Sequence, residues 1–313
     1  MTKHTILPQS GTLHGSFSRD NEPILTIQSG DSVSYSTLDG DWLKELKPAP
    51  NPGHGPEFEL RDPIRDAGHA MCGPIAIEGA MPGMTLAVRI NENRPASWGW
   101  SRVGGRQTEH DLRLGVSEGE PYYLSWELNN ERMLATSHLG HSVRMQPFMG
   151  VLGMPPDEPG LHSTHPPRFC GGNMDCKELV PGTTLYLPIA VKGGLFSVGD
   201  GHAAQGDGEV GSTAIECPMD KVDLTFTLLP DMKLAMPRAN TPAGWLTFGF
   251  HEDLKEATYT ALNGMVDLLQ EVFGFHRKEA LALCSYTVDL RITQIVNGVC
   301  GVHAVLPHGS IRC

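Results

Sequence analysis

Side chains that bind metals or transfer protons are concentrated in one glycine-rich stretch, SVGDGHAAQGDGEV, at residues 197–210. The polar side chains within it and shortly after it are Asp200, His202, Gln205, Asp207, Glu209 and Glu216. Glycine lets the backbone approach a ligand closely and adopt a positive φ angle. The stretch therefore indicates a metal or catalytic site, although Gly-Asp-Gly is also ordinary turn chemistry.

The spacing of Asp200 and His202 suits metal binding, because residues two apart on an extended strand share one face. A carboxylate and an imidazole on one face are natural ligands for zinc or a similar divalent ion. Asp175, which follows Gly171-Gly172, can add a third ligand, a carboxylate oxygen, from another strand. We therefore predict a divalent metal at Asp175, Asp200 and His202. The histidine favours zinc. The carboxylates also tolerate calcium, which could bind as a second ion.

Acid–base and substrate-binding groups are available beside these ligands. Glu209 or Glu216 is a candidate general acid or base. Asn173 and Gln205, together with the N–H groups of the glycine loop at Gly172, are candidates to hold a substrate amide or a developing oxyanion.

Glu78 is a third candidate catalytic carboxylate, because it interrupts the otherwise apolar segment GPIAIEG, and His69 comes shortly before it. His162 and His165 lie in a proline-rich segment and are either site residues or solvated side chains. His14 is expected to be a capping or packing histidine. The serines near histidines are not in a G-x-S-x-G elbow, which argues against a serine hydrolase.

The overall composition limits the partners and the compartment. The chain has 313 residues, 40% hydrophobic and 19% charged, with a formal net charge of −12. An acidic surface disfavours nucleic acid and anionic membranes, and no apolar run is long enough to span a bilayer. The N-terminus lacks the apolar region of a signal peptide, and the seven cysteines contain no C-x-x-C pair. We predict a soluble cytoplasmic protein with reduced thiols.

The periodicity of apolar residues indicates a mostly β, β-rich α+β fold. Strand–turn–strand patterns occur at 23–37, 74–90 and 173–191, and predict hairpins of a β-sandwich or barrel. Helical spacing follows at 251–275, with a second short helix and a strand after it. We expect a β-rich body over 1–235 and a helix–helix–strand part over 236–313, packed on the body or continuous with it.

Several segments together resemble the acetamidase/formamidase family. They are PILTIQSGDSV, GPIAIEGAMPG, HSTHPPRFCGGNMD, LYLPIAV followed by GLFSVGDGHAAQGDGEVGSTAIE, and LCSYTVDLRITQIVNG. The GGNMD and GDGHAAQGDGE blocks, in this order and spacing, are specific. Three positions depart from the family pattern, at Met84, Cys170 and Ser212. Cys170 places the exact substrate in question, and Ser212 argues against a cysteine nucleophile at that position.

The resemblance implies hydrolysis of the C–N bond of short linear amides such as formamide and acetamide, giving a carboxylate and ammonia. It also implies a mostly β fold, a bound divalent metal and a homo-oligomer, expected to be a dimer. Two alternatives stay open. One is an esterase or γ-lactam hydrolase of the same family, and the other is a β-sandwich binding protein with a structural metal.

Overall fold

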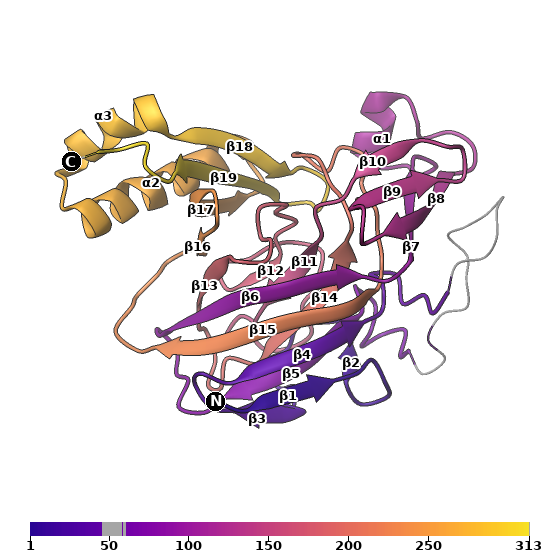
Figure 1. Cartoon of the computed structure of the whole chain (residues 1–313), viewed down its shortest axis with the longest axis horizontal. Coiled ribbons are helices and arrows are strands. Elements are labelled where there is room, and N and C mark those ends of the chain that lie inside the picture. The colour runs from indigo at the N-terminus through magenta and orange to yellow at the C-terminus, as the bar shows by residue number, and fades with distance from the viewer. Residues whose placement is uncertain (46–57, 59–60, 313) are drawn as a thin grey trace.

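Strands are the main regular structure, as the alternating apolar pattern predicts, and those of the described residues make three sheets (Figure 1). The computed structural model describes residues 1–45, 58 and 61–312. The nine-stranded sheet contains, in spatial order, β1 (Lys3–Ile6), β4 (Ser32–Thr37), β15 (Met219–Leu229), β6 (Thr85–Pro95), β13 (Thr184–Pro188), β16 (Arg238–Asn240), β17 (Gly244–His251), β19 (Cys300–Pro307) and β18 (Asp289–Gln294).

Two smaller sheets and three helices complete the described chain. The six-stranded sheet contains β12 (Gly171–Asn173), β11 (Phe148–Gly153), β14 (Phe196–His202), β5 (Met71–Ile77) and β2 (Leu13–His14), with β3 (Leu25–Ile27) paired to β5. The four-stranded sheet contains β10 (Ser142–Arg144), β9 (Leu134–Ser137), β8 (Tyr122–Asn129) and β7 (Trp98–Val103). The helices are α1 (Glu109–Leu114), α2 (Leu254–Phe273) and α3 (Arg277–Thr287).

The nine-stranded and six-stranded sheets pack face to face through a shared apolar core. In β4 the side chains alternate, so that Val33 and Tyr35 are buried between half-buried serines. Phe196 of β14 and Phe226 of β15 meet edge to face across the two sheets, with ring centroids 5.0 Å apart. Burying one such side chain contributes about 1.5–3 kcal/mol. The sheets do not close, so the body is a sandwich of open sheets and the barrel alternative is wrong.

The strand–turn–strand units at 23–37 and 74–90 are present, whereas in the unit at 173–191 only the second strand forms as predicted, because β12 ends at Asn173. The prediction that the units are hairpins is wrong. β3 belongs to the six-stranded sheet and β4 to the nine-stranded sheet, and the same division separates β5 from β6 and β12 from β13. The turn glycines, Gly30, Gly83 and Gly182, all have positive φ. Alternation and a glycine turn occur both in hairpins and in corners between sheets, so the sequence pattern could not distinguish them.

The predicted C-terminal helices are confirmed and cover one end of the nine-stranded sheet (Figure 1). The side chain of Asp253 caps α2 by accepting hydrogen bonds from the N–H groups of Lys255 and Glu256. The buried face of α2, which includes Ala261 and Leu269, packs on apolar residues of β19.

The nine-stranded sheet continues across residue 235, because β13 of the body pairs with β16 of the C-terminal part. The C-terminal part nevertheless has a hydrophobic cluster of its own, between α2, α3 and β19. The division into 1–235 and 236–313 stays a prediction, and the continuous sheet favours its one-domain form.

The six cysteines within the described residues are free thiols, and Cys313 lies outside those residues. None of the helices in the described ranges is long and apolar enough to cross a membrane.

His14 of β2 is a fully enclosed packing histidine. Its Nδ1 lies 2.8 Å from the carbonyl oxygen of Ser16, and its Nε2 lies 2.9 Å from Oγ of Ser197. Because a carbonyl only accepts, Nδ1–H donates to Ser16 and Nε2 accepts from the Ser197 hydroxyl. Burial disfavours the charged ring and lowers the pKa of His14 from 6.5 to about 4.

We predict that this histidine makes folding stability depend on pH. The unfolded chain binds the proton more tightly than the folded chain, so the stabilisation is complete above pH 6.5 and is lost as the pH falls toward 4. Between pH 7 and pH 5, the unfolding free energy should fall by about 2 kcal/mol more in the wild type than in a His14→Gln variant. Urea unfolding at both pH values measures this, and equal losses in the two proteins would contradict the assignment.

Candidate functional site

Three predicted metal ligands converge over one glycine in the six-stranded sheet. Asp200 and His202 lie on β14, and Asp175 follows β12, with β11 between these two strands. Gly150 of β11 lies opposite Asp200, because the flanking pairs are Met149 with Gly201 and Val151 with Gly199. On its other side, the carbonyl of Gly150 accepts from the N–H of Asp175 at 3.3 Å.

The lack of a side chain at Gly150 leaves room for the three ligands to meet. A methyl group there would lie 2.6 Å from Oδ2 of Asp200, 2.7 Å from Oδ1 of Asp175 and 2.9 Å from Cε1 of His202. One ligand atom of each residue lies within 4.8 Å of the others. Asp175 and Asp200 both have positive φ, an uncommon conformation for residues other than glycine and one that clusters at functional sites.

Glu216 joins this cluster from the segment beside β7. Its Oε2 lies 3.1 Å from Nε2 of His202, and Oδ2 of Asp200 lies 3.4 Å from the same nitrogen. The other oxygen of Glu216 accepts from the N–H of Ala214 at 2.8 Å. The backbone of Glu216 is held on both sides by Trp100, whose N–H and carbonyl exchange hydrogen bonds with it. Glu216 is therefore fixed beside His202.

The donor set fits a divalent cation. Oδ1 of Asp175 and Nδ1 of His202 are buried and have no hydrogen-bond partner in the part of the chain that the structure describes. Unpaired buried polar atoms are costly, and a bound cation would satisfy them. Two carboxylates and an imidazole form a set that zinc binds.

The buried acids also need a positive partner. Burial raises the pKa of Asp175 to about 7 and raises the pKa values of Glu209 and Glu216. Burial opposes ionisation of Asp200 as well, but nearby His69 and His202 lower its pKa. Buried like charges this close cannot all be ionised without a compensating cation.

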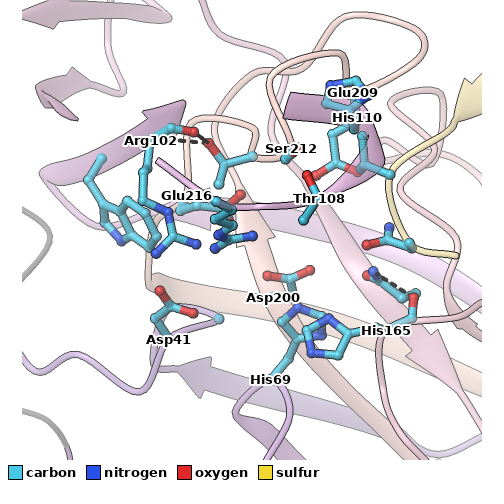
Figure 2. Close-up of a pocket in the computed structure, with 17 residues that line it drawn as sticks. Asp41, His69, Arg102, Thr108, His110, His165, Asp200, Glu209, Ser212 and Glu216 are labelled. Carbon is cyan, nitrogen blue, oxygen red and sulfur yellow. Dashed lines mark hydrogen bonds between the residues drawn. The ribbon is translucent and has the colours of Figure 1, made fainter. Parts of the chain in front are cut away.

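A cavity of about 230 Å³ opens onto the cluster (Figure 2). Glu209, Glu216 and Asp200 line it, and His69 and His165 lie beside Asp200. The rings of the two histidines meet edge to face, with centroids 4.6 Å apart. The wall also includes Trp100, Arg102, Arg106, Thr108, His110 and Ser212.

Of the remaining predicted residues near the cluster, two line the cavity and two do not. Glu209 is buried beside the cavity, and its Oε2 has no partner among the described residues. Asn173 lines the cavity, donates through Nδ2 to the carbonyl of His165 at 3.1 Å and leaves Oδ1 unpaired. Gln205 donates to the carbonyl of Asp175 at 2.8 Å and does not line the cavity. Gly172 is buried in β12 with positive φ, next to Asn173 but away from the cavity wall.

Glu78, the third candidate catalytic carboxylate, lies away from the cluster. Its side chain is exposed just beyond β5, where Gln28 donates to it. β14 pairs with the opposite end of β5 at Met71, and seven residues of strand separate the two ends by roughly 23 Å. The structure therefore does not bring Glu78 to the cluster. The apolar run was read correctly as a buried strand, but it ends one residue before Glu78.

Several residues of the site were missed from the sequence. Gly150 lies in an apolar strand with no polar signal around it. Asp39 is fully buried and accepts from Nε1 of Trp100 at 2.6 Å, beneath the cavity wall. Asn297 donates to Oδ2 of Asp175 at 2.8 Å from the loop between β18 and β19. Of these, only Asn297 stands in a segment already identified by the family resemblance, LCSYTVDLRITQIVNG.

The three residues that depart from the family pattern differ in burial and in whether they line the cavity. Cys170 is buried, donates to the carbonyl of Met154 at 3.1 Å and is not part of the cavity wall. Ser212 lines the cavity and has positive φ. Met84 is half-buried at the edge of the main core.

Comparison with known proteins finds a family that resembles the part of the chain carrying the cluster. The sequence profile of the Acetamidase/Formamidase family matches residues 158–309, which include Asp175, Asp200, His202, Glu209 and Glu216. The match covers a little under half of the chain, so the chain is similar to this family over that part. It is 25% identical to the formamidase of Methylophilus methylotrophus over 256 residues, covering 64% of this chain and 60% of that protein.

Solved structures agree with the family over nearly the whole chain. The acetamidase of Bacillus halodurans superposes with a TM-score of 0.82 at 27% identity, covering 96% of this chain and 97% of that one. The acetamidase of Yersinia enterocolitica gives 0.82 at 26% identity, covering 97% and 92%.

We predict that Gly150→Ala disables the metal site and leaves the fold intact. The added methyl group would collide with two ligand oxygens, so the protein should bind one zinc equivalent fewer, or bind it at least about 100-fold more weakly. Zinc calorimetry on chelator-treated protein measures this, with circular dichroism to check folding. Gly206→Ala is the matched control, because a methyl group there meets nothing within 4 Å. Wild-type zinc affinity in Gly150→Ala would refute the geometry.

Proposed function

We propose that this chain is an amidase that hydrolyses the C–N bond of short linear amides, such as formamide and acetamide, to a carboxylate and ammonia. The observation that carries the proposal is the free carboxylate of Glu209 beside the ligand cluster, in a small cavity. A binding protein with a purely structural metal has no use for an unpaired acid at that position. The formamidase and acetamidase relatives support the same reaction class.

Asp175, Asp200 and His202 would hold the divalent cation, with zinc favoured by the imidazole. When bound, such a cation supplies a Lewis acid that polarises a carbonyl or a water molecule. Glu216 and Asp200 both contact Nε2 of His202, at 3.1 and 3.4 Å, and so orient its imidazole ring. Gln205 and Asn297 hold Asp175 through its carbonyl and carboxylate. These four contacts position the ligands and need not touch the substrate.

The proton transfers are assigned to Glu209. Hydrolysis adds the oxygen of water to the amide carbon, breaks the C–N bond and moves a proton from water to the departing nitrogen. The unpaired Oε2 of Glu209 can take that proton and pass it to the nitrogen, which leaves as ammonia. Asn173 uses one N–H of its amide for the carbonyl of His165 and leaves Oδ1 unpaired, so Oδ1 is suited to accept from the substrate N–H₂.

Other properties implied by the resemblance stay predictions. They are a homodimer, a cytoplasmic location and, as an alternative substrate class, cyclic amides or esters. A cavity of about 230 Å³ holds a small amide together with water, which supports short substrates. Turnover of γ-lactams or esters without turnover of acetamide would favour the alternative.

We predict that Glu209→Gln removes most of the activity. Losing a positioned acid–base group should lower kcat for acetamide by about 10²–10⁴-fold with little change in KM. Steady-state ammonia release measures both constants. Glu78→Gln is the matched control, because this exposed carboxylate lies far from the cavity and its loss should leave kcat/KM within about twofold. Wild-type kcat in Glu209→Gln, or a large loss in Glu78→Gln, would overturn the assignment.

A further inference from the structure

A second group of metal-binding side chains lies outside the cavity, where the loop after β12 meets the C-terminal part of the nine-stranded sheet. It consists of Cys176, Glu178 and His303. Cys176 and Glu178 come directly after the segment that carries Asp175, and His303 lies on β19. Cys176 and His303 are fully buried, and the side chain of Glu178 is 12% exposed. None of the three lines the cavity that opens onto the cluster of Asp175, Asp200 and His202.

The two distances from Oε2 of Glu178 to its neighbours in this group match those between ligands of one zinc ion. Sγ of Cys176 lies 3.3 Å from Oε2 of Glu178, and Nε2 of His303 lies 3.4 Å from the same oxygen. Tetrahedral zinc, with bonds of 2.0–2.3 Å, separates its ligand atoms by about 3.3–3.8 Å. A direct hydrogen bond from imidazole to carboxylate would instead be about 2.8 Å long.

The histidine is held as a metal ligand usually is. Nδ1 of His303 lies 2.7 Å from Oγ1 of Thr293, which fixes the ring, while Nε2 is buried without a hydrogen-bond partner among the described residues. Outer hydrogen bonds of this kind orient ligating imidazoles. Arg291 occupies the other carboxylate oxygen, Oε1 of Glu178, at 2.8 Å. That contact leaves Oε2 directed at the cysteine and the histidine.

We propose that Sγ of Cys176, Oε2 of Glu178 and Nε2 of His303 form a second, structural site for zinc or a similar thiophilic divalent cation. Binding would deprotonate the Cys176 thiol and release one proton to solvent. The thiolate and the carboxylate then balance the two charges of the ion, and Arg291 remains paired with Oε1 of Glu178. The partly exposed edge of Glu178 leaves a fourth position for water. The site is independent of the proposed amide hydrolysis.

Such a site would hold together two segments that carry residues near the cavity. Cys176 is the residue after Asp175, and the strand that carries His303 follows the loop that carries Asn297. Asn297 donates to Asp175 across the same junction. A cation at Cys176, Glu178 and His303 would therefore restrain both partners of that hydrogen bond from outside the cavity.

Cobalt spectroscopy separates this site from the first one. Titrating chelator-treated, reduced protein with Co²⁺ should produce the thiolate-to-cobalt charge-transfer absorption in the near ultraviolet, with an amplitude that corresponds to one Co²⁺ at the thiolate site. The cluster of Asp175, Asp200 and His202 contains no sulfur and cannot give this absorption. The band should therefore remain in Asp200→Asn, disappear in Cys176→Ala, and require at least about tenfold more Co²⁺ in His303→Gln.

Cys217→Ala is the matched control, because this buried thiol lies near His202 but outside the group. It should keep the band. In the Asp200→Asn background, zinc at about 100 times its Kd should also raise Tm by roughly 3–6 °C, and Cys176→Ala should abolish that rise. Absence of a thiolate band in the folded wild type would overturn the proposal, and would leave a metal-free network of Cys176, Glu178 and Arg291. A band lost in Cys217→Ala but kept in Cys176→Ala would overturn it too.

Discussion

Asp175, Asp200 and His202 can meet because the strand between them has no side chain at the point where they converge. Gly150 lies between β12 and β14, and any Cβ there would occupy the space of the ligand oxygens. Two of the three ligands also adopt left-handed backbone conformations to reach that point. The surrounding structure must hold this strain and the crowded charge, and it does so through hydrogen bonds from three separate parts of the chain.

The sheet topology brings the residues that make these hydrogen bonds to the cluster. The chain crosses from one sheet to the other at each glycine corner, so β12 and β13 belong to different sheets although they are consecutive strands. Glu216 is fixed by Trp100 of the four-stranded sheet, and Asp175 by Asn297 from the C-terminal part. The cluster therefore depends on contacts that span most of the sequence, and a truncated C-terminal part would leave Asp175 without one of its partners.

The sequence predicted the residues of the cluster better than their surroundings. Two-residue spacing correctly placed Asp200 and His202 on one strand, and the glycine-flanked Asp175 does reach them from a neighbouring strand. Glu209 and Glu216 also lie beside the cluster. The long helix was readable because its apolar stripe and its Asp253 cap are local signals.

What the sequence could not supply depends on long-range pairing. The role of Gly150 follows only from which strands flank β11, and Asp39 and Asn297 reach the site from distant segments. A strand-end position such as Glu78 differs from an interior one by a single residue, which periodicity does not resolve. The second group, Cys176, Glu178 and His303, could not be predicted for the same reason, because His303 lies far from the other two in the sequence.

The central claim is that the cluster over Gly150 is a metal-dependent amidase site. The most direct test is ammonia release from formamide and acetamide by the purified protein, by the protein after chelation, and after zinc is returned. We predict release that is lost with the chelator and restored by zinc. Release that persists at full rate in protein shown to be metal-free, or no release from any short amide with metal bound, would contradict the account.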